Sequence, residues 1–392
     1  MKKTIFLTVA VSLLIWTVSC NKPSASATSG NQPFPSTEYS VQQSASLELK
    51  TIAVDEWLRP PRATSDVGLH YIIRFTYPSQ SKNKAVLESL QRKFITHVFG
   101  KDYASLTPEA AVNACIEDWK KEYNKDMKEM AKENSSEYVL IYEYVCTDTL
   151  LFMNDALLQM QTYSYIQQGG AHGFGGSSSH LFNLQTGKEY SRDDIFKPEK
   201  ADFIVWSISD ALFNYLGIED GEDNPISFKD LWSEEINFAV TQKGIVLTYD
   251  NQWIQDAIIL PYTRIMANLH EDTPVWELAK DAAMGELNDN SRALLDKDGL
   301  SIGSSLEDLL KRYPKCKIEI YYTDTGSYQY ATLEEMLNGY GKDWYGVYCD
   351  WAIFTPLKSN GEEMGIRFFI LFKDLDNRSK YQKESKIWMI ND

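Results

Sequence analysis

The sequence predicts an α+β fold, with antiparallel sheets that carry helices on one face and a small α+β domain at the C-terminal end. A helix pair is followed by two long strand-like stretches, whose short connections leave no room for crossover helices. In the last hundred residues, short helices alternate with strands. The chain has 392 residues, 43% of them hydrophobic. It is therefore long enough to form two or three domains.

Residues 1–19 form a predicted signal peptide. Two lysines precede an apolar run from Ile5 to Val18, shorter than the roughly 20 residues of a membrane-spanning helix. Cys20 lies two residues after the end of this run. Together with Thr17-Val18-Ser19 before it, it resembles a lipobox, the site where bacterial lipoproteins are acylated on cysteine and cleaved. Residues 20–44, rich in Ser, Thr and Pro, are predicted to be a flexible tether. We therefore expect a lipid-anchored envelope protein; the alternative is a secreted protein with Cys20 free.

The charge balance bears on the class of partner. The formal net charge is −16. Nucleic acid and anionic surfaces are therefore poor partners, whereas a cationic partner is attracted, and salt weakens the attraction. Aromatic residues make up 13% of the chain, which suits binding of carbohydrate rings as well as ordinary strands and cores. The oligomeric state stays open.

The N-terminal part predicts strands and two helices. Leu69 to Tyr77 alternates as a half-buried strand does. A helix with apolar residues from Leu87 to Val98 follows, capped by Asn83. A second helix begins at Pro108, capped by Thr107. After it come the two strand-like stretches, which are Tyr138 to Val145 and Leu150 to Ile166.

The middle part predicts hairpins and helices. A hairpin over residues 181–190 turns at 185–187, and a short helical turn covers 191–196. A long helix is expected from Ala201 to Leu216. A second hairpin, Ile236 to Tyr249, turns at Gln242-Lys243-Gly244.

The C-terminal domain is expected over residues 289–392. Capping boxes at Ser304 to Glu307 and at Thr332 to Glu335 begin short helices. Two strands place a cysteine on their apolar face. One face is Cys316, Ile318, Ile320 and Tyr322, and the other is Val347, Cys349, Trp351 and Ile353.

Four cysteines remain besides Cys20, and they permit two disulfides in three connectivities. We favour Cys115 with Cys146 and Cys316 with Cys349, because each pair lies within one expected domain. Four free buried thiols are the alternative. The sequence has no CxxC motif and no Cys/His cluster, so no zinc finger or ribbon is predicted.

The stretch from about Leu69 to Ile265 resembles the extracytoplasmic region shared by PdaC-type peptidoglycan deacetylases and RsiV anti-sigma factors. The motifs that carry the resemblance, in chain order, are Tyr163 to Gly173, Asn183 to Lys188, Asp193 to Phe196, Phe238 to Tyr249 and Leu260-Pro261-Tyr262. It implies a PdaC-like α+β domain over residues 45–180 and an RsiV-like region over residues 181–288. It also implies an envelope domain that binds a partner, since the corresponding region of RsiV-like proteins binds lysozyme, a cationic protein.

The sequence departs from the family at three points. The deacetylase catalytic domain of PdaC has no counterpart, and no His-x-x-x-His metal pair occurs. The loop from Asn251 to Ala257 is short and carries Trp253, which puts a pocket built from that loop in doubt. The sigma-factor-binding and membrane-spanning segments of RsiV are also missing, which argues against signalling of that kind.

The glycine-rich segment from Gly169 to Gly176 holds the candidate site. Glycines on both sides of His172 allow positive φ angles and close backbone approach, so the imidazole is expected at a sheet edge or a pocket. Asp193 and Asp194 are candidate catalytic partners of His172. The proposed binding residues are Gly169, Gly170, His172, Phe174, His180 and Trp253.

Two other interpretations of this segment remain. A metal held by His172, His180 and Asp193 or Asp194 is the first, and a β-bulge locked by a hydrogen bond from His172 to the backbone is the second. A phosphate loop is disfavoured because no lysine and helix follow the glycines. We predict neither a metal nor a cofactor.

Three classes of function remain. The favoured one is a binding module for a cationic protein such as lysozyme or for a cell-wall glycan. The second is a cell-wall carbohydrate hydrolase or deacetylase that uses His172 with nearby carboxylates. The third is a structural or assembly lipoprotein without a small ligand.

Overall fold

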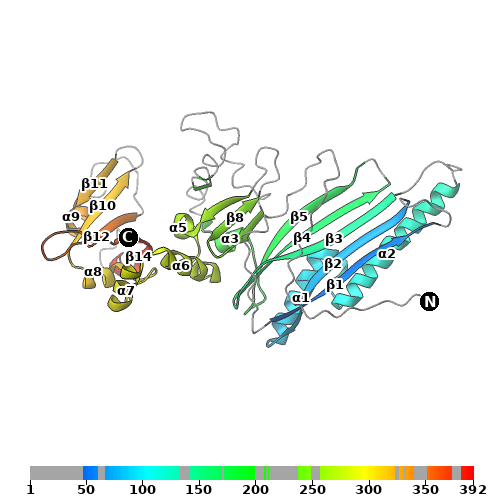
Figure 1. Cartoon of the computed structure of the whole chain (residues 1–392), viewed down its shortest axis with the longest axis horizontal. Helices are drawn as coiled ribbons and strands as arrows, with labels where there is room; N and C mark the ends of the chain where they lie inside the picture. Colours follow the sequence, from blue (N-terminus) through cyan, green and yellow to red (C-terminus); the bar gives the residue numbers. More distant parts are fainter. Residues whose placement is uncertain are drawn as a thin grey trace.

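The computed structural model confirms the α+β class (Figure 1). It has a six-stranded, a five-stranded and a three-stranded sheet in the part that it describes. The described residues are 47–60, 67–132, 141–169, 172–198, 207–208, 211, 237–248, 257–322, 326–330, 332–339, 351–372 and 381–392. Several predictions lie outside them, namely the signal peptide, Cys20, the tether, Gly170, Trp253, Cys349 and most of the helix from Ala201 to Leu216.

The six-stranded sheet is formed by the N-terminal part of the chain. Its strands, in spatial order, are β1 (Leu47–Leu58), β2 (Gly68–Ser81), β3 (Ile141–Met153), β4 (Leu157–Gln168), β5 (Phe174–Asn183) and β6 (Glu189–Tyr190). All neighbours are antiparallel except β2 and β3, which are parallel. Helices α1 (Lys84–Phe99) and α2 (Pro108–Lys132) connect these two strands. The helix pair is therefore a crossover connection between two parallel strands, in a sheet whose other pairs are antiparallel as predicted.

Both helices begin where the sequence predicts. The Asn83 side chain accepts hydrogen bonds from the Ala85 and Val86 amides, and Thr107 accepts one from the Ala110 amide. The helices pack on one face of the sheet, against a buried row of side chains from β2. That row is Tyr71, Ile73, Phe75 and Tyr77, as the alternating pattern predicts.

Strand β3 is longer than predicted. It continues through Leu150 to Met153, and the turn to β4 comes at Asn154, whose side chain accepts hydrogen bonds from the Ala156 and Leu157 amides. An Asx turn of this kind ends the strand at Asn154. The predicted break before Leu150 was therefore misplaced.

The other face of the large sheet is partly covered by the three-stranded sheet, β7 (Asn237–Val240), β8 (Gly244–Thr248) and β9 (Ile258–Pro261). The Asn237 side chain binds Ser177 and Ser179 of β5, and the Ser179 hydroxyl donates to the Phe238 carbonyl at 2.8 Å. The predicted β7–β8 hairpin is confirmed. Because β5 spans residue 180 and pairs with β6, that residue is not a domain boundary.

The C-terminal part has its own sheet, with the strand order β11-β10-β12-β13-β14. These strands are β10 (Cys316–Tyr322), β11 (Gly326–Tyr330), β12 (Trp351–Pro356), β13 (Arg367–Leu371) and β14 (Lys386–Asn391). The α-helices of the second half, among the described residues, are α3 (Arg192–Ile195), α5 (Tyr262–Ile265), α6 (Pro274–Glu286), α7 (Asp289–Asp298), α8 (Leu306–Arg312), α9 (Leu333–Gly339) and α10 (Tyr381–Glu384). One apolar core runs from β4 and β5 through α6 into the C-terminal sheet.

Two details of the C-terminal prediction were wrong. The capping box of α8 is formed by Ser305 and Asp308, one residue beyond the predicted position. In the sheet, Ile318 pairs with Phe354, so these two side chains share a face, and Ile353 lies on the opposite face. The two strand faces singled out in the sequence, that of Cys316 and that of Trp351 and Ile353, therefore lie on opposite sides of the sheet.

The cysteines of the described part are free thiols. Cys115, Cys146 and Cys316 are all buried and unpaired, in agreement with the alternative to disulfides. Burial raises the pKa of Cys146 and of Cys316 to about 12. Cys115 lies near enough to Cys146 for that neighbour, after burial, to raise its pKa as well. Among the described helices none is long and apolar enough to cross a membrane.

Candidate functional site

The glycine-rich segment joins β4 to β5. Gly169 has a φ of 68°, the left-handed conformation that glycine permits. A Cβ atom at Gly173 would lie 2.4 Å from the ring of Tyr165, so glycine allows the close approach predicted there. His172 is exposed, and in the described part of the chain no hydrogen bond reaches its imidazole. The side chain of Phe174 is 85% exposed. Among the described residues, the predicted lock between His172 and the backbone is not seen.

The carboxylates predicted to assist His172 lie at the other end of β5. Tyr190, which shortly precedes them, pairs with Leu181, and the strand from Phe174 to Leu181 spans about 24 Å. Asp194 caps α3 together with Ser191 and binds Lys188 at 2.5 Å. Its pKa is held at about 2, first by the hydrogen bond from Lys188 and then by those from Ser191. The structure does not bring His172 together with Asp193 or Asp194, so neither the catalytic nor the metal arrangement built on His172 exists.

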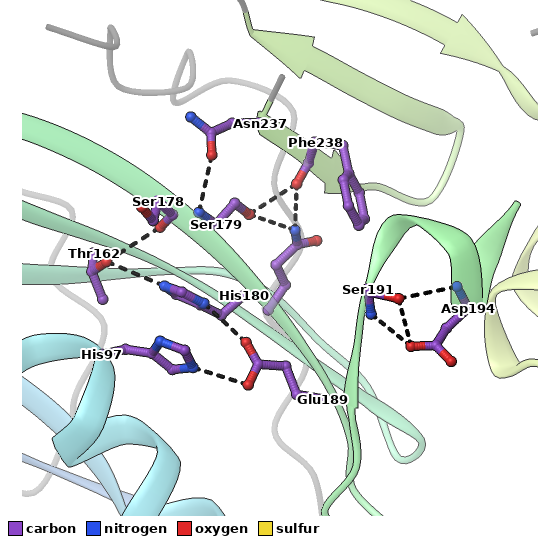
Figure 2. A network of polar contacts seen from close by, with 11 residues as sticks. His97, Thr162, Ser178, Ser179, His180, Glu189, Ser191, Asp194, Asn237 and Phe238 are labelled. Carbon is purple, nitrogen blue, oxygen red and sulfur yellow. Dashed lines mark hydrogen bonds and ion pairs between the residues drawn. The ribbon is translucent and has the colours of Figure 1, made fainter. Parts of the chain in front are cut away.

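A different polar cluster lies between α1 and the sheet and contains His97, His180 and Glu189 (Figure 2). One carboxylate contacts both imidazoles. His97 Nε2 lies 2.9 Å from Glu189 Oε2, and His180 Nδ1 lies 3.1 Å from Glu189 Oε1. The two rings are stacked, with centroids 3.6 Å apart and an angle of 26° between their planes.

Each member of this cluster comes from a different element. His97 is in the last turn of α1. His180 lies on the helix-covered face of β5, which also holds the buried Phe182. Glu189 is placed by the β5–β6 hairpin, where it pairs directly with Phe182. The side chains of Phe182, Glu189 and His180 therefore share one face, and α1 lays His97 across it. Thr162 of β4 adds a hydroxyl 3.4 Å from His180 Nε2.

The charges of the cluster follow from partial burial. Burial opposes the negative charge of Glu189, but the hydrogen bonds from His180 and His97 outweigh it and hold the pKa of Glu189 at about 2. Burial, together with the neighbouring His97 ring, lowers the pKa of His180 despite the opposing effect of Glu189. At neutral pH the carboxylate is therefore charged and His180 is neutral.

Of this cluster only His180 was predicted as a site residue. The hairpin prediction contains a signal for Glu189, because pairing residues 181–184 with 188–190 puts Glu189 beside His180. No comparable signal exists for His97, which is 92 residues from Glu189 in the sequence and reaches it only through the packing of α1.

A second feature is the part of the large sheet that β7 to β9 leave uncovered. We call it the open sheet face and define it by residues of one face of β1, β2, β3 and β4, which are Asp55, Trp57, His70, Glu143, Tyr163 and Tyr165. Trp57 and Tyr163 are each 39% exposed. Large aromatic side chains are exposed here beside carboxylates.

His70 holds the acidic and aromatic side chains of the open sheet face in position. Its Nε2 lies 2.9 Å from Asp55 and its Nδ1 lies 3.2 Å from Glu143, so the ring spans both carboxylates. Trp57 stacks on this ring with centroids 4.3 Å apart. The guanidinium of Arg59 lies 5.0 Å from the centre of the Trp57 ring. The face therefore already holds one cation against an aromatic ring.

No protein-family model matches the chain, and no curated protein matches it. Among solved structures, it is similar to a crystal structure of a DUF3298 family member from Bacteroides fragilis, with a TM-score of 0.52 and 21% sequence identity, over 61% of this chain and 100% of that chain. A DUF3298 family protein from Pseudomonas aeruginosa matches with a TM-score of 0.39 and 16% identity, over 59% of this chain and 96% of that one. The first likeness shows a shared fold, which agrees at that coarse level with the predicted resemblance to envelope domains.

Proposed function

We propose that this chain is a lipid-anchored envelope protein of the PdaC/RsiV-like kind that binds a cationic protein on the open sheet face. The observation that carries the proposal is the combination of exposed aromatic rings with carboxylates on one surface that the described elements leave uncovered. Trp57 and Tyr163 supply the rings, and Asp55 and Glu143 supply the charge. Lysine and arginine side chains of a partner are held by both kinds of group.

The charge of the whole molecule supports this choice of partner. The net charge of −16 becomes −18 when a signal peptide with two lysines is removed. Such a molecule attracts a cationic protein over a distance of about a Debye length, and added salt weakens the attraction. The resemblance to RsiV-like regions, which bind lysozyme, points to the same class of partner.

The proposed anchor explains how the binding face stays at the envelope. A lipid on Cys20 followed by the tether of residues 21–44 would hold the folded part close to a membrane while it remains free to turn. In this proposal Cys20→Ala releases the protein from membranes in a detergent-partition assay. Retention of the variant in the detergent phase would contradict the anchor.

Binding is tested with lysozyme as a cationic probe, by surface plasmon resonance at low and at high salt. We expect binding at low salt that weakens strongly at high salt, and a loss of about tenfold or more in affinity for Trp57→Ala or Tyr163→Ala. Phe174→Ala is the matched control, because Phe174 is the most exposed large hydrophobic residue among those described but lies on the opposite face of the sheet.

Two results would overturn the proposal. One is the absence of lysozyme binding at low salt by the wild-type chain. The other is an equal loss of affinity in the Phe174→Ala control. If purified peptidoglycan pulls down the wild type but not Trp57→Ala, while lysozyme binds neither, the face recognises a glycan instead of a cationic protein.

A further inference from the structure

We propose that His97, His180 and Glu189 form a binding site for a divalent transition-metal ion of the zinc class. The three side chains come from α1, β5 and β6 and each offers one ligand atom. These atoms all lie within 4.8 Å of one another (Figure 2). The inference goes beyond the proposed function, because the cluster lies on the helix-covered face of the sheet and the partner is proposed to bind the other face.

The chemistry of the three ligands suits zinc. Imidazole nitrogen and carboxylate oxygen are ligands that zinc prefers, and two histidines with one glutamate form a known set that leaves a fourth position for water. The side chains of His97 and Glu189 are 23% and 28% exposed, so solvent reaches the cluster. A softer, thiolate-based site is not involved, because the described cysteines are elsewhere in the core.

The distances leave room for a metal after small shifts. Two ligands of a tetrahedral zinc ion, each about 2.0 to 2.1 Å from it, are about 3.4 Å apart. The nitrogen-to-oxygen distances here are 2.9 and 3.1 Å. Each nitrogen–oxygen pair would therefore have to separate by only a few tenths of an ångström to hold an ion between its two atoms.

One rearrangement is required. A metal lies close to the plane of each imidazole that it binds, whereas the rings of His97 and His180 are stacked with 26° between their planes. His97 is the ring that turns, because its polar contact in the described part is with Glu189 alone, whereas His180 is also near Thr162. The torsion that turns an imidazole has a broad energy profile, so this movement is inexpensive.

Thr162 positions His180 for this role. Its hydroxyl lies 3.4 Å from the Ser178 carbonyl and 3.4 Å from His180 Nε2. Without metal, His180 Nδ1–H donates to Glu189. With the ion bound, the neutral ring would carry its proton on Nε2 and donate it to the Thr162 hydroxyl, which would donate to the Ser178 carbonyl. A second partner of this kind is typical of metal-bound histidines.

The convergence of the ligand atoms distinguishes this cluster from the other histidine–carboxylate contact on the large sheet. His70 provides the contrast, because its two ring nitrogens face two carboxylates on opposite sides, an arrangement that cannot converge on one ion.

The experiment titrates the full mature chain in detergent with Zn²⁺ by calorimetry and with Co²⁺ by visible absorption, after treatment with EDTA. We expect one ion per chain and the spectrum of four-coordinate cobalt without a thiolate charge-transfer band. His97→Gln and Glu189→Gln should each weaken binding by about 100-fold or more, and Thr162→Val by about tenfold. His70→Gln is the matched control and should bind like the wild type.

Melting curves without metal show whether each variant is folded. In folded variants, Zn²⁺ should raise the melting temperature of the wild type and of His70→Gln but not that of Glu189→Gln. The proposal is overturned if the wild type gives no cobalt spectrum, if His97→Gln binds as tightly as the wild type, or if His70→Gln loses as much affinity as His97→Gln. In the first case the cluster is only a hydrogen-bonded network. These outcomes leave the lysozyme experiment unaffected, since that experiment depends on the opposite face.

Discussion

The His180 imidazole stacks on that of His97 with ring centroids 3.6 Å apart, and both rings share the Glu189 carboxylate. This arrangement makes stability depend on pH in a definite direction. Burial and the neighbouring His97 lower the pKa of His180 in the folded state. Because the unfolded state then binds the proton more readily, the folded state loses stability as pH falls below about 6.5.

We therefore expect the metal-free wild type to lose stability between pH 7 and pH 5, and His180→Gln to lose less. Glu189 adds a second loss at lower pH. Its pKa of about 2 is below the ordinary value of 4.5, so its contribution is present above pH 4.5 and disappears as pH falls toward 2. Urea unfolding in EDTA at several pH values measures both effects. His172→Gln, which changes an exposed imidazole, should leave the profile unchanged; a flat wild-type profile would contradict the expectation.

The contribution of Asp148 to folding stability is expected to depend on pH in the opposite direction. Its carboxyl group is 4% exposed and accepts a hydrogen bond from the Thr76 amide on one oxygen, while the other oxygen has no partner among the described residues. Burial raises the pKa of Asp148 to about 7, against the opposing effects of Thr76 and Arg74. Because the folded-state pKa is raised, its contribution to stability is complete below about pH 4 and is lost as pH rises through 7.

Asp148→Asn should therefore stabilise the protein at pH 8 by up to about 4 kcal/mol and have little effect at pH 4, since the pKa is raised from 3.8 to about 7 and each pKa unit corresponds to about 1.4 kcal/mol. Unfolding in urea at both pH values measures the difference. The control is Asp102→Asn, which changes an exposed carboxylate. A variant that is destabilised equally at both pH values would show that Asp148 acts through packing and not through its charge.

The sequence predicted the elements whose signals are local. Asn83 and Thr107 mark the starts of α1 and α2, and the turn at Gln242-Lys243-Gly244 marks the β7–β8 hairpin. Alternation placed β2 correctly, because one face of that strand is uniformly apolar. In each case the residues that determine the element are close together in the chain.

Features that depend on distant pairing could not be predicted. The parallel pairing of β2 with β3 is decided by how the two helices pack, and no local pattern reports it. In β12 both faces are apolar, with Ala352 and Phe354 on one and Ile353 on the other, so alternation could not identify the core face. The same reason explains the candidate site. His97 joins His180 only after α1 has packed on the sheet.

Removing the hydroxyl group should change folding stability in opposite directions at two buried tyrosines. The Tyr144 hydroxyl donates to Glu122 at 2.8 Å and accepts a hydrogen bond from Gln168 at 2.8 Å. The Tyr123 hydroxyl is buried with no partner in the described part of the chain. Tyr144→Phe should therefore destabilise by about 1 to 2 kcal/mol, and Tyr123→Phe should be neutral or stabilising by up to about 1 kcal/mol.

Both substitutions keep an aromatic ring, so each leaves packing unchanged, including the stacking of Tyr144 on Trp119 at 4.7 Å. Chemical denaturation at one pH compares the two variants directly. Equal destabilisation of both would show that the loss comes from altered packing and not from hydrogen bonding.

The last prediction compares one glycine that the fold requires, Gly244, with one that it does not require, Gly176. A Cβ atom at Gly244 would lie 2.2 Å from the carbonyl oxygen of Leu260, a backbone atom of the paired strand β9. A Cβ atom at Gly176, in the glycine-rich segment singled out by its sequence, would meet nothing within 4 Å. Backbone atoms cannot move aside as a side chain can, so Gly244→Ala must push β9 away from β8.

We expect Gly244→Ala to destabilise by about 2 kcal/mol or more, and Gly176→Ala to change stability by no more than about 0.5 kcal/mol, or to stabilise through lower entropy of the unfolded chain. Thermal melting gives the comparison, and hydrogen exchange at the β8–β9 amides locates the damage. If Gly176→Ala proved the more harmful substitution, the glycine-rich segment would have a structural role that its contacts in the fold do not explain.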